Sequence, residues 1–401
     1  MTFADLFASP DDPDLNFCYL QQKIDEGDIK AAIPVVERML LLDPYQPRTR
    51  ILYASLLYHT DMMADARREF EEVRTRELPQ SDDMLVLDYL KRIDELNERN
   101  SHYLSFTVTG HNDNNRNNAP DGSTILFYGY EYDYRIPYES DYGTETSVSY
   151  DFERSYGSYL QHALLASLTY QRDNQAKFDQ QDYSTWQGSV GTRLTAGKTD
   201  ITTTVSAAYQ RLAGDGLLRS HGGRIRADYP IDWRDAGIRL DLAASAGVKA
   251  ENYVSDRSSN SSGKRYSSRV SASFTFGTAH NLYTSLGYTD KSARDDSLAY
   301  TSWNTSLSYR WTHLSGHSLS TYISRGKTLY SATPLYVTGN TDIKRHDIPV
   351  FASAAWRMPL TIADDFDLTI SGERQITRSD IPNYQSRNTR WLASLTKSFS
   401  F

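Results

Sequence analysis

Residues 111–122 contain the side chains most suited to binding an ion. They read HNDNNRNNAPDG, and Asp113, Asn115 and Asn117 have the spacing that opens a calcium-binding loop. The match then fails, because Asn118 replaces the required glycine and Thr124 replaces the bidentate glutamate. Asn, Asp, Gly and Pro favour turns instead. The sequence predicts a polar loop here, with no metal site and no cofactor.

The same loop continues into a tyrosine-rich stretch, residues 123–138, which reads STILFYGYEYDYRIPY. Such a stretch forms a small hairpin or folds into a lumen. Residues 111–140 are too long for a simple turn, so we expect a cap, a plug or part of a mouth. The residues assigned to this cap or plug are Asn112, Asp113, Asn114, Tyr130, Tyr132 and Tyr134.

Catalytic chemistry has little support in the sequence. The nine histidines show no readable pairing with Ser and Asp, and a triad is recognised by geometry rather than by sequence position. The chain lacks the Gly-rich loop with Lys-Ser/Thr that cradles a nucleoside phosphate. We therefore expect a protein that is not an enzyme and has no nucleotide as its energy source.

Composition narrows the class of protein further. The 401 residues carry a formal net charge of -8, which argues against nucleic acid as the main partner. The single cysteine, Cys18, excludes an intrachain disulfide. Tyrosine is abundant, at 29 residues, which suits strands and aromatic girdles better than a helical enzyme.

The first hundred residues have a helical pattern with a 34-residue period. Ala32 and Ala66 are 34 apart, as are Val36 and Phe70. The segments 27–44 and 61–79 resemble second helices of tetratricopeptide repeats, and a further helix over about 82–97 would cap them. Two repeats make a short array, so we expect one that is trimmed at its N-terminus.

In such repeats the first helix of each pair lines a binding groove. The groove would receive a peptide or a client protein, although packing against a missing repeat or a neighbouring domain explains the same side chains equally well. The residues that would line it are Phe17, Gln21, Ile24, Ile51, Ser55, Tyr58 and His59.

From residue 102 the hydrophobic period changes from 3.6 to 2, which indicates strands. Leu104, Phe106 and Val108 begin the first of fourteen alternating runs, and the last run ends at Phe401. Short connections follow the even-numbered runs: 154–158, 195–200, 276–281, 312–317 and 359–365. Longer polar ones follow most odd-numbered runs: 111–140, 171–182, 250–264, 327–342 and 378–388, with 212–217 as an exception. This asymmetry is typical of outer-membrane barrels.

A soluble sandwich would alternate as well, but three features favour a barrel. Long strands suit a tilted membrane span. The C-terminal SLTKSFSF resembles the recognition signal of outer-membrane barrels, with Thr396 in place of the usual Gly. The second face of the strands also carries charges, which a lumen tolerates and a closed core does not. These charges are Arg224, Arg226, Arg239, Asp241, Arg310, Arg357, Asp367 and Glu373.

The predicted fold class is an α-helical tetratricopeptide-like N-terminal domain (1–100) followed by a 14-stranded antiparallel transmembrane β-barrel (101–401). An even strand count places both barrel ends, and hence the helical domain, in the periplasm of a Gram-negative bacterium. This domain order resembles the surface lipoprotein assembly modulator (Slam) family. The residues that carry the resemblance are the 34-residue period, the strand count and the segment Gly110-His111-Asn112-Asp113-Asn114-Asn115-Arg116-Asn117, which is similar to a Gly-Tyr-Asp-Ser-Asn-type segment after the first barrel strand of that family. The departures are His111, Asn112 and the short repeat region.

The resemblance implies a translocator that moves lipoproteins, or related secreted proteins, to the cell surface, with the repeats receiving the client. Its other partners would be outer-membrane lipid and the barrel assembly machinery, and no nucleic acid. Exit would use the lumen, or a seam between the first and last strands at Leu104, Phe106, Val108, Leu395, Phe399 and Phe401. Simple closure of the barrel is the preferred explanation of these strands. Polysaccharide export through a barrel with periplasmic repeats is the alternative function.

Overall fold

The structure is a computed structural model of the 401-residue chain, and it describes residues 9, 11–76, 78–97, 100–156, 161–233, 237–255, 258–340, 342–360 and 366–401. Parts of the predicted connections 154–158, 250–264, 327–342 and 359–365 lie outside these residues. The chain divides into two compact units, residues 1–98 and residues 99–401.

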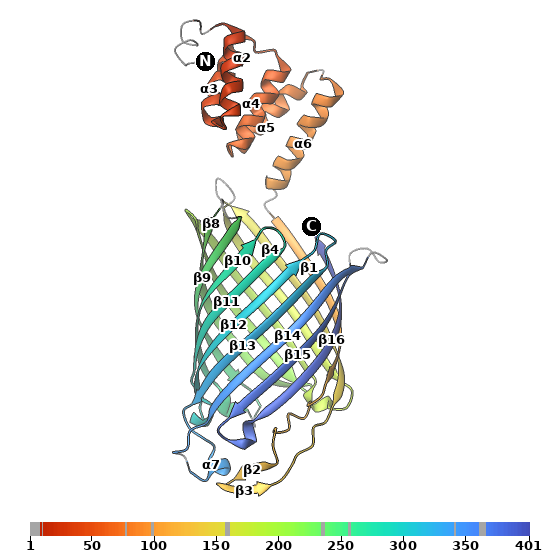
Figure 1. The fold of residues 1–401 in the computed structure, drawn as a ribbon, viewed down its shortest axis with the longest axis vertical. Coiled ribbons are helices and arrows are strands. Elements are labelled where there is room, and N and C mark those ends of the chain that lie inside the picture. Colours follow the sequence, from red (N-terminus) through yellow and green to blue (C-terminus); the bar gives the residue numbers. More distant parts are fainter. Residues whose placement is uncertain are drawn as a thin grey trace. The chain divides into compact units, whose positions relative to one another are not determined.

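The first unit is helical (Figure 1). Its helices are α2 (Pro13–Asp25), α3 (Ile29–Leu42), α4 (Pro47–His59), α5 (Met63–Arg74) and α6 (Gln80–Asn97). Helix α2 begins with a proline in its first turn, and the side chain of the N-cap residue Asp12 accepts hydrogen bonds from the N–H groups of Asp14 and Leu15. Among the described helices, none is long and apolar enough to cross a membrane.

The 34-residue period has a structural counterpart in the burial of the helices. Ala32 and Ala66 are fully buried, as are Val36 and Phe70. Two core clusters result, one beneath α2, α3 and α4 and the other beneath α4, α5 and α6. Apolar positions 34 residues apart are thus buried in both helix pairs.

The second unit is a closed antiparallel barrel of fourteen strands, as the alternation predicted (Figure 1). The strands are β1 (Asn100–Asp113), β4 (Asp141–Tyr156), β5 (His162–Gln175), β6 (Tyr183–Ala196), β7 (Thr199–Leu212), β8 (Asp215–Trp233), β9 (Ile238–Tyr253), β10 (Gly263–Phe276), β11 (His280–Lys291), β12 (Tyr300–Thr312), β13 (Ser318–Tyr330), β14 (His346–Leu360), β15 (Phe366–Ser379) and β16 (Ser386–Ser400). Each strand pairs with its sequence neighbour, and β1 pairs with β16 to close the sheet.

The two ends of the barrel differ. We call the end where β1 begins and β16 ends the terminal end, and the opposite end the loop end. The loop end carries the hairpin β2 (Thr124–Phe127) and β3 (Tyr130–Asp133), together with the short helix α7 (Leu335–Thr338), all beyond the strand ends (Figure 1). The predicted small hairpin in residues 123–138 is therefore present.

Strands at the loop end extend further than the sequence pattern indicated. Asn112 and Asp113 were predicted to lie in the loop, but they belong to β1, where Asn112 pairs with Trp391 and Tyr142, and Asp113 with Arg390 and Asp141. Hydrogen bonding of this end of β1 to both β16 and β4 outweighs the preference of Asn and Asp for turns. Asn114 is exposed and its side-chain oxygen accepts a hydrogen bond from Thr389 N–H, so it holds the loop to the start of β16.

Candidate functional site

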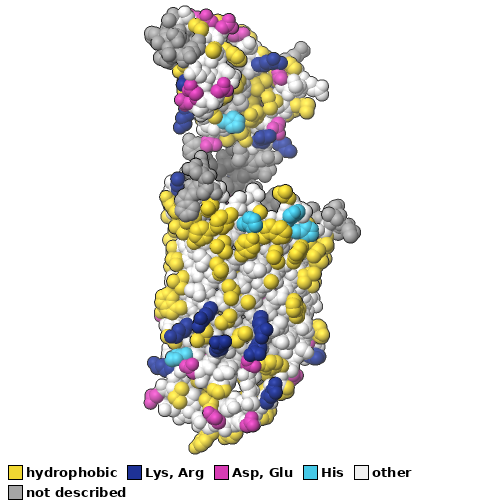
Figure 2. All heavy atoms as spheres, in the orientation of Figure 1, with side chains coloured by type: hydrophobic (Ala, Val, Ile, Leu, Met, Phe, Trp, Pro, Cys, Tyr) yellow, Lys and Arg dark blue, Asp and Glu magenta, His cyan; other side chains and the backbone are white. Residues whose placement is uncertain are grey.

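The inner and outer faces of the barrel follow from strand parity. On the outer face, Trp303 and Trp311 lie eight residues apart on β12, which is about 26 Å along the strand. With a tilt of about 40°, that spans roughly 20 Å along the barrel axis, close to the height of a membrane-facing apolar band. Side chains between such aromatics are exposed and apolar, for example Leu307, Ile323 and Val190. Figure 2 shows hydrophobic side chains gathered in a band near the terminal end.

The barrel exposes far more surface than a filled protein. The chain's accessible area is 24201 Å², whereas a compact protein of 45.6 kDa exposes about 16,000 Å². If the two units are treated as separate compact bodies, the expected accessible surface area rises only to about 19,000 Å². The excess indicates a sheet that is accessible on both faces, and hence a lumen that side chains do not fill.

At the terminal end, the inward charges form exposed ion pairs. Arg239 lies 2.9 Å from Asp241, and its side chain is 59% exposed. Arg357 lies 2.6 Å from Asp367 and is 55% exposed. Two further pairs, Arg226 with Asp228 and Arg193 with Glu153, line the same half. All except Arg193, Glu153 and Asp228 are among the predicted luminal charges, so this half of the lumen is polar and of mixed sign.

At the loop end, inward charges of the same types are buried. One cluster joins β1 and β5, which lie on either side of β4, and in it His111 Nε2 is 2.7 Å from Asp173 Oδ1. Arg116 reaches within 3.8 Å of Asp173 and 3.9 Å of Asp113. The His111 and Asp173 side chains are 0% and 2% exposed. Arg390 adds a second cation 3.9 Å from Asp113.

Gly143 makes the His111 contact possible. It lies on β4, between β1 and β5, and a Cβ atom there would be 2.3 Å from His111 Cε1. The imidazole therefore crosses over the β4 backbone to reach Asp173. Because Gly143 has no side chain, His111 on β1 can reach Asp173 on β5, although these two strands are not neighbours in the sheet.

Two more buried clusters continue around the loop end. On β9, β10 and β11, Glu251 lies 3.0 Å from Arg265 and 3.4 Å from Lys291, and its side chain is 2% exposed. Before β14, Arg345 donates to Asp347 over 3.0 Å. Its guanidinium also stacks 4.2 Å from the Tyr330 ring and 3.5 Å from the Tyr384 ring. At three places around the mouth, an inward carboxylate of an ion pair is thus shielded from solvent: Asp173, Glu251 and Asp347.

Three loops at neighbouring strands, β1–β4, β13–β14 and β15–β16, pack together into a cap at the loop end. The N–H groups of Tyr128 and Gly129 donate to the carbonyls of Tyr336 and Val337, over 2.8 and 2.9 Å. Gly129 has φ of 82°, and a Cβ there would be 2.5 Å from Thr338 O, so glycine permits this close approach. Asn383, from the β15–β16 connection, exchanges two hydrogen bonds with the backbone of Leu126.

Within the cap, burial raises the pKa of Tyr138, and its hydrogen bond to Asp121 raises it further. Burial likewise raises the pKa of Tyr384. The predicted cap residues Tyr130, Tyr132 and Tyr134 belong to this hairpin region and are exposed.

Asp113 and Asn115, which have the spacing of a calcium-binding loop, form hydrogen bonds within the protein instead. Asp113 accepts from Asn115 N–H, and the Asn115 amide donates to the carbonyls of Ala119 and Arg387. These side chains therefore fix the loop to the barrel wall. Within the described part of the chain, no cluster of three His, Cys, Asp or Glu residues has the arrangement of a metal site.

The predicted seam is an unbroken strand pair. β1 and β16 are in register from Tyr103 opposite Ser400 to Asp113 opposite Arg390. Beyond the strand, Phe401 and His102 exchange two backbone hydrogen bonds, and their rings stack at 5.3 Å. The seam residues Leu104, Phe106, Val108, Leu395, Phe399 and Phe401 lie on the outward face of this closed pair. In this structure the first and last strands close the barrel.

The predicted groove of the helical unit is only partly accessible. Phe17, Gln21 and His59 are exposed, whereas Ile24 and Tyr58 pack against the core clusters. Ile51 is buried in the core and is not available to a ligand, which corrects its assignment. The cause is the approach of α6 to α4, where Tyr89 lies 5.1 Å from the Tyr58 ring. Ser55 donates to the carbonyl of Leu52 within α4.

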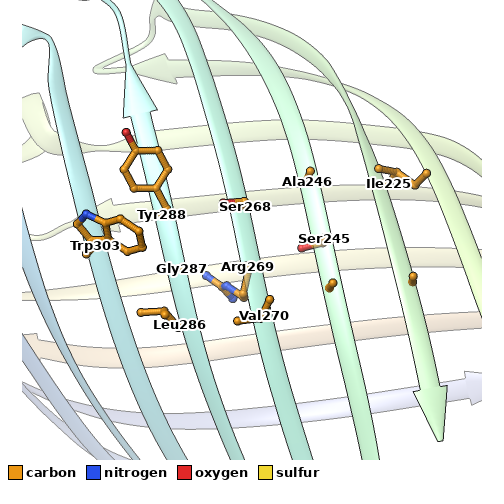
Figure 3. A pocket seen from close by; sticks show the side chains of 12 residues that line it. Ile225, Ser245, Ala246, Ser268, Arg269, Val270, Leu286, Gly287, Tyr288 and Trp303 are labelled. Atoms are coloured by element: carbon orange, nitrogen blue, oxygen red, sulfur yellow. The ribbon is translucent and has the colours of Figure 1, made fainter.

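One surface hollow faces away from the lumen. It has a volume of about 510 Å³ and is lined by outward side chains of β8 to β12, including Ile225, Ala246, Val270, Leu286 and Trp303 (Figure 3). Its polar neighbour Arg269 belongs to the inward set of β10. The hollow thus lies on the apolar outer face.

No protein-family model matches this chain, and no curated protein matches its sequence. Solved structures with a similar architecture include an outer membrane channel from Pseudomonas putida F1, with 12% identity, a TM-score of 0.38, and coverage of 75% of this chain and 96% of that chain. OccAB1 and OccAB3 of Acinetobacter baumannii are 8% and 7% identical, with TM-scores of 0.40 and 0.39. OccAB1 is covered to 98% and OccAB3 to 99%, against 76% and 75% of this chain. The resemblance to the Slam family stays a prediction.

Proposed function

We propose that this protein is an outer-membrane translocation barrel. It passes a polypeptide client, a lipoprotein or a related secreted protein, from the periplasm to the cell surface. The observation that carries the proposal is the contrast within the lumen: exposed charges of both signs at the terminal end and buried ion pairs beneath a cap at the loop end. A route that is hydrated on one side and closed on the other suits regulated passage better than free diffusion.

The orientation follows from the strand number. An even number of strands brings both ends of the barrel to the same side, which is the periplasm for barrels with short periplasmic turns and long external loops. The helical unit precedes β1 in the chain and therefore belongs on the periplasmic side. The cap then faces the cell exterior, and the barrel assembly machinery would insert the chain through its C-terminal strand.

A polypeptide client is favoured by the apolar surface of the helical unit. Phe17 on α2 is 56% exposed, and Met84, Leu85 and Leu87 are exposed on α6. Exposed apolar side chains on helices bind apolar segments of other chains, whereas a sugar polymer needs polar and aromatic partners. The helical unit, read as a tetratricopeptide-like array, would receive the client through Phe17, Gln21 and His59.

Photo-crosslinking in living cells tests this function. A photoreactive phenylalanine replaces Phe17 on α2, the inward Tyr103 at the terminal end, or Tyr132 in the cap; all three side chains are exposed. The outward Trp303 is the matched control. We expect one secreted or lipid-anchored protein to be captured at the first three positions and not at Trp303. Capture of polysaccharide or of its synthesis proteins instead would replace the proposal with polysaccharide export.

A further inference from the structure

The outward face of β13 to β16 carries a group of cations close to the loop end. Arg325 and Lys327 on β13, and Arg374 and Arg378 on β15, are exposed at outward positions. We call these four residues the basic patch. Figure 2 shows Lys and Arg side chains on this part of the barrel face, beyond the apolar band.

Strand register brings the four side chains together. Arg325 is opposite Val350, and Val350 is opposite Ile376, which lies between Arg374 and Arg378 on the same face of β15. Two strand spacings separate β13 from β15, about 10 Å, and four residues separate Arg374 from Arg378, about 13 Å. The patch is therefore of a size that one lipid headgroup covers.

The patch has no internal counter-charge. Among the described outward positions of β12 to β16, none carries an acidic side chain. The nearby Asp380 pairs with His346 at 2.8 Å, and Asp121 pairs with Arg387 at 3.0 Å. Within the described residues, no carboxylate lies within ion-pair distance of the four cations. Cations that repel one another without compensation indicate an anionic partner.

A hollow in the apolar wall adjoins the patch. It has a volume of about 510 Å³, and its outward lining includes Ala352, Ala354, Ile370, Trp391 and, at the loop-end side, Arg374. The small alanine side chains form the floor of the hollow, and the larger side chains of Ile370 and Trp391 form its sides. The hollow of Figure 3 has an alanine floor as well, but no outward cation is among its lining residues.

We propose that this face binds a phosphorylated glycolipid of the outer leaflet, of the lipid A type. The basic patch holds its phosphates, with arginine guanidinium groups as bidentate donors. The hollow over Ala352 and Ala354 accepts one of its acyl chains. Charge complementarity selects the headgroup, and the apolar hollow selects a lipid over a free phosphate ion. The inference rests on the membrane orientation given under the proposed function, but not on the nature of the client.

Binding of bis-phosphorylated lipid A to the purified, delipidated full chain in detergent tests the proposal. The variant R325Q/K327Q/R374Q/R378Q is compared with R172Q/R211Q/R219Q/K264Q, which removes four outward cations from other strands. We expect the first variant to weaken binding at least about ten-fold, as for the loss of charge-assisted contacts. The second should stay within about two-fold, because its four positions lie on β5, β7, β8 and β10, outside the basic patch. Equal losses in both, or no loss in the first, would overturn the proposal.

A second pair of variants tests the hollow without changing charge and guards against misfolding. A354L fills the hollow beside the patch, and A246L fills the hollow of Figure 3. We expect only A354L to weaken lipid A binding, and dephosphorylated lipid A to bind poorly to the wild type. Equal binding of the dephosphorylated lipid, or equal loss in A246L, would contradict the site. Neither readout involves a client, so failure here leaves the crosslinking test of function intact, and the reverse also holds.

Discussion

The two ends of the barrel lumen use the same residue types with opposite accessibility. At the terminal end, Arg239 and Asp241 pair in solvent, whereas at the loop end the buried Glu251 pairs with the buried Lys291 and the partly exposed Arg265. Exposed pairs contribute little to stability, and buried ones become costly when one partner is lost. The difference is one of solvent access, because the inward ion pairs at the terminal end are hydrated and the acidic members of those at the loop end are buried.

Removal of the cap should have the largest effect. Arg116 N–H donates to the carbonyl of Glu139 over 2.8 Å, so the ends of the loop lie close together. A short Gly-Ser linker in place of residues 116–138 is therefore compatible with the barrel. It removes the β2–β3 hairpin and the Arg116 contacts, and we expect a nearly closed pore to become conducting in planar bilayers.

The matched control for the cap is a Gly-Ser replacement of the turn 313–316 at the terminal end. It should leave conductance unchanged. If both replacements opened the pore equally, or if neither did, closure could not be assigned to the loop end.

Loss of a buried counter-charge comes next in size. Glu251→Ala leaves Arg265 and Lys291 facing each other without compensation, so we expect the free energy of unfolding to fall by about 3 kcal/mol. Urea unfolding of the folded barrel in detergent measures it. A loss below about 1 kcal/mol would place this cluster in the same class as exposed pairs.

A smaller loss is expected from crowding His111. Gly143→Ala puts a methyl group where the His111 ring lies, and the ring must leave Asp173 or the strands must shift. Overpacking of this kind costs about 2 kcal/mol. The control is Gly287→Ala on β11, where the nearest atom is 3.7 Å from the new Cβ. Equal unfolding free energies for the two variants would show that the His111 contact is not tight.

The smallest effect should come from the terminal end. Asp241→Ala removes the partner of an Arg239 side chain that is already in solvent, so the change in unfolding free energy should stay below about 1 kcal/mol. Urea unfolding of the folded barrel in detergent measures this change as well. A loss as large as that of Glu251→Ala would erase the distinction between the two ends.

The sequence predicted the barrel well because its signal is local. Alternation of apolar and polar residues sets the two faces, and the lengths of the connections distinguish the two ends. The inward charges at the terminal end, such as Arg239 and Arg357, were recognised by the same parity. The hairpin in residues 123–138 followed from composition and turn preference.

The loop-end clusters were not predicted, because their partners come from distant strands. His111 and Asp173 meet only through register across β4, and Gly143 gives no sign of this in a single sequence. Polar residues at the end of β1 resembled loop residues, since their contacts lie inside the barrel. Ile51 was misassigned because a helical period identifies an apolar face but not the helix that covers it.

The most direct test of the account compares the accessibility of two inward serines. Ser220, at the loop end, is buried, and Ser320, at the terminal end, is partly exposed. Each is changed to cysteine in a chain whose own exposed Cys18 is replaced by serine, and labelled with a membrane-impermeant maleimide in permeabilised cells. We predict rapid labelling of S320C and protection of S220C. Equal labelling of both cysteines in the intact chain would contradict a lumen that is open at one end and closed at the other.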